Sequence, residues 1–287
     1  MSFNLQLLDR PGIQDLPYVN ASLNYLIPMS EKPVYYIEET PPGQPQHSGS
    51  FEPRQVLIRD ARSIVQKLSL DQEGFALINH QSIIQNFYDD EEVRRVYYPE
   101  AEKLLTELTG AVKVIVFDHN VRDAKRAQRK EDNAKEPVKR VHNDFTARSG
   151  YSRARLELAV QGIENIDELL EHRFSVVNVW RPIASPVQES PIAVCDAQSI
   201  AFTDLVPLDL VYRDRVGETY AITYNSAHRW FYFPQQKSDE ALLIKCFDSA
   251  ADGRARFAAH SAFDDPTSSP DAPPRESIEL RTLIFYS

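Results

Sequence analysis

The second half of the chain is a series of short apolar segments, and this series constrains the fold more than any other feature. After Gly110, alternating Val, Ile and Phe residues predict a strand, and strand-like runs then follow one another: FSVVNVW, SPIAVCD, DLVPLDLVY, TYAITY, RWFYF, ALLIKCF, RFAAHSAF and SIELRTLIFY. Pro, Asp, Asn and Gly separate these runs, as in sandwiches and barrels. The sequence therefore predicts a mainly β protein without a regular strand–helix alternation.

The first 111 residues are expected to frame this β region. Residues 1–50 form an N-terminal arm with candidate strands at Ala21 to Ile27 and Pro33 to Ile37. The arm ends in the linker PPGQPQHSGS, where His47 is predicted to be solvated. Residues 51–111 are expected to be mostly helical support, because apolar residues recur at helical spacing before Gly110, a natural helix end.

Residues 112–287 are expected to form the β core, with one inserted helix near 162–173. Because large β units often reach this length as one domain, a single domain spanning 1–287 is predicted.

Composition excludes several classes of function. The formal net charge of −10 disfavours a surface that follows nucleic-acid phosphates. The basic-rich stretch from Arg122 to Arg140 is interspersed with acids, which is typical of a solvated helix or loop, although it could attract an anion. No apolar run approaches the roughly 18 residues of a membrane span. With only nine glycines, the chain has no dinucleotide fingerprint or phosphate-binding loop.

The expected location is the cytoplasm. The N-terminal segment MSFNLQLLDRPGIQ lacks the basic and apolar regions of a secretion signal. Cys195 and Cys246 lie in apolar strands, which suits reduced, buried thiols. We expect a small-molecule substrate and no nucleic-acid or membrane partner, and the sequence leaves open whether the chain forms a homo-oligomer.

The run His142-Asn143-Asp144 is a candidate for two ligands of a metal ion. In an extended segment alternate side chains point the same way, so His142 and Asp144 project together. Two imidazoles and one carboxylate on one face of the ion are typical of non-haem iron(II) oxygenases, because this set leaves positions open for a cosubstrate and dioxygen. The third ligand must come from another strand.

The end of the chain offers that ligand and a cationic group. His260 lies in one of the last two strand-like segments, and Arg275 follows it with Ser277 alternating beside it. A guanidinium is suited to bind the remote carboxylate of a dicarboxylate such as 2-oxoglutarate. The second candidate for the distal ligand is His228, in NSAHRWFYFP.

Motifs along most of the chain, from about Asn24 to Phe285, carry a family resemblance: PVYYIEETPPG, IRDAR, DQEGFALINH, FYDDEEVRRVYYPE, VFDHNVR, PVKRVHNDFT, VVNVWRPI, PIAVCDAQS, DLVYRDRVGETY, NSAHRWFYFP, DEALLIKCFDS, AHSAFDDP and APPRESIELRTLIF. The sequence resembles the 2-oxoglutarate and iron(II)-dependent oxygenases, in the branch similar to fungal gibberellin desaturases and cephamycin-pathway hydroxylases. The resemblance implies a double-stranded β-helix, or jelly roll, with flanking helices.

The resemblance also implies roles for the candidate residues. It implies that His142, Asp144 and the distal histidine bind iron, that the distal histidine is His260 rather than His228 because His260 lies on the strand just before Arg275 and Ser277, and that Arg275 with Ser277 binds the C5 carboxylate of 2-oxoglutarate. The implied reaction uses dioxygen to hydroxylate, desaturate or cyclise a small molecule of specialised metabolism. Two alternatives remain: a non-catalytic β-sandwich binding protein, and an iron oxygenase that does not use 2-oxoglutarate.

Three residues are candidates for binding the substrate. Arg181 would be costly inside a strand without an anionic partner, so we expect it to hold an acidic substrate, the cosubstrate, or one of Asp196 and Asp204. Trp180 and Trp230 either line an apolar pocket or belong to the core.

Overall fold

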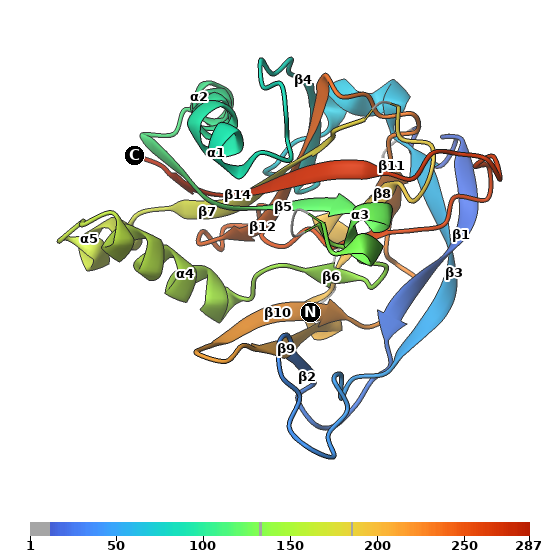
Figure 1. Cartoon of the computed structure of the whole chain (residues 1–287), viewed down its shortest axis with the longest axis horizontal. Coiled ribbons are helices and arrows are strands. Elements are labelled where there is room, and N and C mark those ends of the chain that lie inside the picture. Colours follow the sequence, from blue (N-terminus) through green and yellow to red (C-terminus); the bar gives the residue numbers. More distant parts are fainter. Residues whose placement is uncertain (1–11, 132–133, 185) are drawn as a thin grey trace.

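The computed structural model describes residues 12–131, 134–184 and 186–287, and two β-sheets dominate it (Figure 1). The larger sheet has nine strands in the spatial order β1, β3, β11, β8, β13, β6, β10, β9 and β2. Their bounds are Tyr18–Leu26 for β1, Val34–Tyr36 for β2, Phe51–Asp60 for β3, His142–Asn143 for β6, Ile192–Cys195 for β8, Leu205–Val211 for β9, Val216–Ile222 for β10, Trp230–Tyr232 for β11 and His260–Ala262 for β13.

The smaller sheet is antiparallel and has five strands in the order β4, β12, β7, β14 and β5. These strands are β4 (Phe75–Asn79), β5 (Lys113–Asp123), β7 (Phe174–Pro182), β12 (Glu240–Asp248) and β14 (Glu276–Phe285). The two sheets form the jelly roll expected for an iron and 2-oxoglutarate oxygenase fold.

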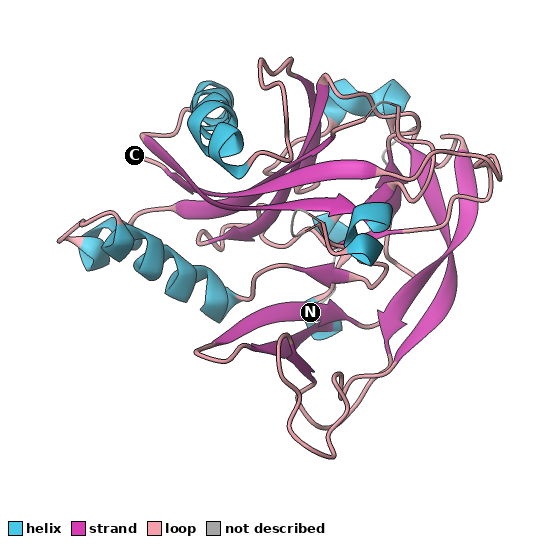
Figure 2. Ribbon diagram, viewed as in Figure 1, coloured by secondary structure: helices cyan, strands magenta, loops and turns pink. Residues whose placement is uncertain are grey.

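The helices lie outside the two sheets (Figure 2). They are α1 (Asp90–Glu92), α2 (Tyr98–Thr109), α3 (Ala124–Arg129), α4 (Ala147–Val160) and α5 (Ile166–Glu171), with a π-helical turn at Val93–Tyr97 and 3₁₀ turns at Arg62–Lys67, Ala197–Ser199 and Phe202–Asp204. Gly110 ends α2 in the left-handed conformation, with φ of 68°, as the sequence predicts.

Burial on both faces explains the continuous apolar runs of β7 and β12. Every residue of β7 and of β12 is buried. Along β7, Val176 and Trp180 belong to the core between the sheets, whereas Val177 and Val179 pack in a second core that includes α2. A strand covered on both faces cannot show a polar alternation. All eight strand-like runs of the second half contain strands of the structure.

The boundaries of three expected segments need correction. The expected N-terminal arm, where it is described, contributes β1 and β2 to the larger sheet, and residues 51–111 contribute β3 and β4 as well as helices. The helix expected near 162–173 is present as α5, and the structure adds α4 before it, which begins directly after its capping residue Thr146. Among the described residues, no helix has the length and apolar character to cross a bilayer.

Candidate metal centre

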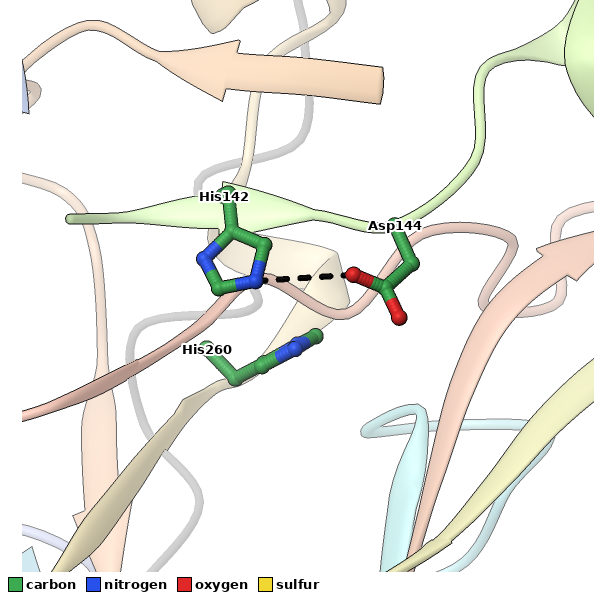
Figure 3. Close-up of side chains that lie close together, drawn as sticks. All are labelled: His142, Asp144 and His260. Carbon is green, nitrogen blue, oxygen red and sulfur yellow. Dashed lines mark ion pairs between the residues drawn. The ribbon is translucent and has the colours of Figure 1, made fainter. Parts of the chain in front are cut away.

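Pairing of two short strands places two histidines side by side. His142 on β6 lies directly opposite His260 on β13, and their ring centroids are 4.4 Å apart. Asp144 follows β6, and its Oδ1 is 3.5 Å from Nε2 of His142. One ligand atom from each of the three residues lies within 4.8 Å of the others (Figure 3). The structure therefore brings together the three residues that the sequence proposed.

Hydrogen bonds orient both imidazoles. Nδ1 of His142 donates to the carbonyl oxygen of Arg140 at 2.8 Å, and Nδ1 of His260 lies 3.3 Å from the carbonyl oxygen of Ala258. Since a carbonyl only accepts, the Nδ1 atoms carry the protons and the Nε2 lone pairs remain available. This is the arrangement that orients histidines bound to a metal ion.

The smaller sheet holds the carboxylate of Asp144 from the other side. Asn178 on β7 and Arg281 on β14 are cross-strand partners. Nδ2 of Asn178 donates to Oδ2 of Asp144 at 2.9 Å, and Nε of Arg281 donates to the same oxygen at 3.1 Å. Oδ1 is thereby left on the side of the histidines, so the two sheets share the orientation of this carboxylate.

The protonation states suit a set of metal donors. Burial and the neighbouring His142 lower the pKa of His260 to about 3, so its ring is neutral at physiological pH. Burial opposes ionisation of Asp144, but Arg281 and the two histidines hold the pKa of this carboxyl well below its ordinary value. The centre therefore presents neutral imidazole and ionised carboxylate, which are the forms that bind metal.

Arg275 lines a narrow cavity together with both histidines and Trp180, and Ser277 follows it two residues later on β14. Arg275 is 4% exposed and donates from Nη1 to the carbonyl oxygen of Ser190 at 2.6 Å. Among the described residues, its buried Nε and the buried Oγ of Ser277 have no hydrogen-bond partner. Buried donors in native proteins are normally satisfied, so these two atoms require an acceptor.

Sequence reasoning missed other residues of the centre although a signal was present. Arg275, Ser277, Glu279 and Arg281 alternate along one strand and therefore share a face. Glu279 and Arg122 line the narrow cavity as well. Burial and the charge of Asp144 raise the pKa of Glu279. Extending the period of two beyond Ser277 would have identified both Glu279 and Arg281.

A second, larger cavity also borders the centre. Its volume is about 390 Å³, and His142 and Asp144 form part of its wall. The narrow cavity and the large cavity share Arg122, Val138 and His142. A volume of this size falls in the range of about 300–1,000 Å³ typical of small-molecule sites.

The other candidate residues lie away from the centre. Both ring nitrogens of His228 have partners, since Nδ1 is 3.1 Å from the hydroxyl of Tyr25 and Nε2 is 3.1 Å from Oδ2 of Asp204. Trp230 is fully buried, and its Nε1 donates to Tyr25 at 2.7 Å. Trp180, in contrast, lines the narrow cavity.

The expected ion pair of Arg181 with Asp196 or Asp204 is wrong. Asp196 pairs with Arg229 at 2.8 Å, and Asp204 contacts His228. Arg181 is 1% exposed, hydrogen-bonds to the ring and carbonyl of His80, and lines neither cavity.

Known proteins share both the sequence pattern and the fold. A family model described as "Oxidoreductase/YMDC permease-like domain" matches residues 23–285. The chain is 31% identical over 294 residues to the hydroxylase/desaturase efuI of Hormonema carpetanum, covering 94% of this chain and 96% of that protein. It is 35% identical over 240 residues to the alpha-ketoglutarate-dependent dioxygenase phiK of a fungal species, covering 81% of this chain and 84% of that protein.

The chain belongs to the Fe(II)/2-oxoglutarate-dependent dioxygenases. The fold of this dioxygenase is similar to that of the iron and alpha-ketoglutarate-dependent endoperoxidase NvfI, with a TM-score of 0.84 and 28% identity. The similarity covers 94% of this chain and 98% of that one. This chain is therefore an enzyme that depends on iron(II) and 2-oxoglutarate.

Proposed function

We propose that His142, Asp144 and His260 hold iron(II), and that Arg275 and Ser277 bind the remote carboxylate of 2-oxoglutarate. One observation carries the proposal. The imidazoles of His142 and His260 and the ionised carboxylate of Asp144 lie within ligand distance of one another, and Arg275 lines the narrow cavity beside them. The buried Nε of Arg275 and the buried Oγ of Ser277 have no acceptor among the described residues. Both halves fit their groups, because the donor set suits iron(II) and the unpaired donors suit a carboxylate.

Arg275 supplies the charge for this carboxylate. Burial and the nearby Arg122 lower the pKa of Arg275 to about 9, so the guanidinium remains cationic at neutral pH. Among the described residues it has no ion-pair partner, and Trp180 lies beside it with the guanidinium carbon 5.5 Å from the ring centroid. A buried arginine without a counter-ion is costly, and a bound carboxylate removes that cost.

The bound iron and 2-oxoglutarate, with dioxygen, supply an oxidant that removes hydrogen from a substrate C–H bond while the oxo acid becomes succinate and carbon dioxide. The protein itself fixes the geometry. Asn178 and Arg281 hold one oxygen of Asp144, so the other oxygen keeps its direction toward His142. His142 and Asp144 form part of the wall of the large cavity, so a substrate held in this cavity would lie beside the centre.

We further propose that the dioxygenase hydroxylates, desaturates or cyclises a small molecule of specialised metabolism. The named relatives hydroxylase/desaturase efuI and endoperoxidase NvfI support this range of outcomes. Placement of the target bond within the large cavity selects among them. We also propose that residues 1–287 act as one domain, because both sheets contribute to the centre, and that the enzyme works in the cytoplasm, where its two free, buried cysteines remain reduced.

The assignment of ligands can be tested by titrating the protein with iron(II) and 2-oxoglutarate without oxygen. We expect a weak visible charge-transfer band that disappears in His142→Ala and His260→Ala. The matched control is His228→Ala, which should retain the band, and circular dichroism checks that each variant is folded. Retention of the band in His260→Ala together with its loss in His228→Ala would overturn the assignment.

A further inference from the structure

The large cavity has an excess of positive charge, although the whole chain has a net charge of −10. Its wall includes the arginines Arg122, Arg140, Arg153, Arg215 and Arg281 and the acids Asp118, Asp144 and Glu218. Five cations against three anions leave a surplus of two charges. A concave wall of one sign of charge concentrates its field and attracts ligands of the opposite sign.

Each acid of the wall already has a cationic partner, so none of them is left to pair with the remaining arginines. Arg281 binds Asp118 at 2.9 Å and Asp144 at 3.1 Å. Glu218 pairs with Lys32 at 2.6 Å. None of these acids forms an ion pair with another arginine of the wall.

The remaining arginines differ in their surroundings. Arg153 pairs with Glu157 at 3.0 Å, and Arg122 also lines the narrow cavity. Arg140 and Arg215 line only the large cavity, and neither has a carboxylate within ion-pair distance in the part of the chain that the structure describes. Of these two, Arg140 is nearer to the metal centre, because it lies two residues before His142 in the sequence. Its carbonyl oxygen also accepts the hydrogen bond from Nδ1 of His142.

Aromatic rings hold the guanidinium of Arg140 in place. Its central carbon is 5.0 Å from the ring centroid of Tyr35 and 5.5 Å from that of Phe51. Nη1 lies 2.6 Å from Nε2 of His47, and the His47 ring stacks on Tyr35 with centroids 3.7 Å apart. Burial and the charge of Arg140 lower the pKa of His47 to about 4, so His47 adds no charge. The guanidinium is therefore fixed in orientation and has no carboxylate partner among the described residues.

We propose that the substrate of this dioxygenase is an apolar molecule with a carboxylate or comparable oxyanion, and that Arg140 binds this anion. The inference rests on the proposed function, because it assigns the large cavity to the substrate. A planar guanidinium fixed by stacking presents paired donors to an oxyanion. The apolar part of the substrate contacts the rest of the wall, which includes Phe117, Phe145, Leu156, Leu208, Leu210 and Val216.

Two fluorescent probes that differ in charge test the proposal. Anilinonaphthalene sulfonate carries an anion on an aromatic body, whereas N-phenylnaphthylamine has the same body without the charge. Each is titrated into protein loaded with iron(II) and 2-oxoglutarate in the absence of oxygen, so that the cosubstrate fills the narrow cavity. We expect Arg140→Gln to weaken binding of the sulfonate about tenfold and binding of the neutral probe less than about twofold.

Two further variants make the result decisive. Arg140→Lys keeps the charge but loses the planar, stacked guanidinium, so its preference for the sulfonate should lie between those of the wild type and Arg140→Gln. Arg94→Gln removes an arginine whose side chain is 53% exposed, which pairs with Asp90 and does not line the cavity, so it should leave both affinities unchanged. Unchanged sulfonate binding in Arg140→Gln, equal loss for both probes, or loss in Arg140→Lys as large as in Arg140→Gln would each overturn the proposal.

The visible band of the iron and 2-oxoglutarate complex is recorded in the same samples. A wild-type protein without the band contradicts the proposed function. A wild-type protein with the band, but whose preference for the sulfonate does not depend on Arg140, contradicts only the anion site.

Discussion

Replacement of Asn178 by Leu isolates the contribution of one hydrogen bond to metal binding. Asn178 is fully buried on β7 and donates to Oδ2 of Asp144 at 2.9 Å, while its own Oδ1 has no partner among the described residues. Leu has the same branched arrangement of four side-chain heavy atoms, so the change removes the donor without leaving a cavity. It also removes a buried, unsatisfied oxygen, so the free energy of unfolding should change by less than about 1 kcal/mol.

The expected loss of metal affinity follows from what remains. Arg281 still donates to Oδ2 at 3.1 Å, so Asp144 keeps its charge and one of its two side-chain hydrogen bonds. Loss of a group that orients a metal ligand typically lowers metal affinity about 10- to 100-fold. With one donor retained, we expect the lower limit, about tenfold or ~1.4 kcal/mol.

Anaerobic competition with a chromophoric chelator measures the iron(II) affinity, and denaturant unfolding measures stability. The control is Thr282→Val, because Thr282 is buried on β14 beside Arg281 and donates to the carbonyl oxygen of Val177 at 2.7 Å. It should cost about 1 kcal/mol of stability and leave the iron affinity unchanged. If Asn178→Leu binds iron within twofold of the wild type, the orientation of Asp144 does not depend on this bond.

Three other changes have defined outcomes. Arg275→Gln should weaken 2-oxoglutarate binding about 10- to 100-fold, measured by the visible band, without changing iron affinity. Burial opposes ionisation of Glu240, but its bonds to Arg62 and to the backbone N–H of Lys237 lower its pKa. These bonds therefore stabilise the fold fully above the ordinary pKa of a glutamate, and their effect disappears as the pH falls through the pKa of Glu240 in the folded protein. The midpoint of thermal unfolding should consequently fall less on acidification in Arg62→Leu than in the wild type. Gly150→Ala should lower the free energy of unfolding in denaturant by about 1–3 kcal/mol, because the new Cβ would lie 2.6 Å from Phe247; unchanged stability would show that the ring moves freely.

The elements that sequence reasoning identified are those with local signals. Alternating apolar residues marked the strands, and the spacing of His142 with Asp144 and of Arg275 with Ser277 required only a strand's period of two. The choice of His260 over His228 depended on its place in the strand before Arg275. The structure agrees with that choice in geometry, since His260 is the cross-strand partner of His142.

The parts that were missed depend on contacts between distant segments. Asn178 and Arg281 both reach Asp144 because β7 and β14 are neighbours, which no local pattern reveals. His47 lies in a linker whose composition predicts solvation, yet it lines the large cavity and stacks on Tyr35. Arg181 was expected to need a carboxylate, but it is accommodated by His80 and by the ring of Tyr97, whose centroid is 4.9 Å away.

The division of the centre between two sheets has a consequence for stability. Both histidines belong to the larger sheet, while Asn178 and Arg281, which hold Asp144, belong to the smaller one. Iron should therefore bind only when the sheets are packed together, and a ligand that binds only the folded state stabilises it by about 2.7 kcal/mol at a concentration of 100 times its Kd. For a chain of this length that corresponds to a rise in Tm of roughly 5 °C. Thermal unfolding without oxygen should show this rise in the wild type and not in His260→Ala; an equal rise in both proteins would mean that the metal binds elsewhere.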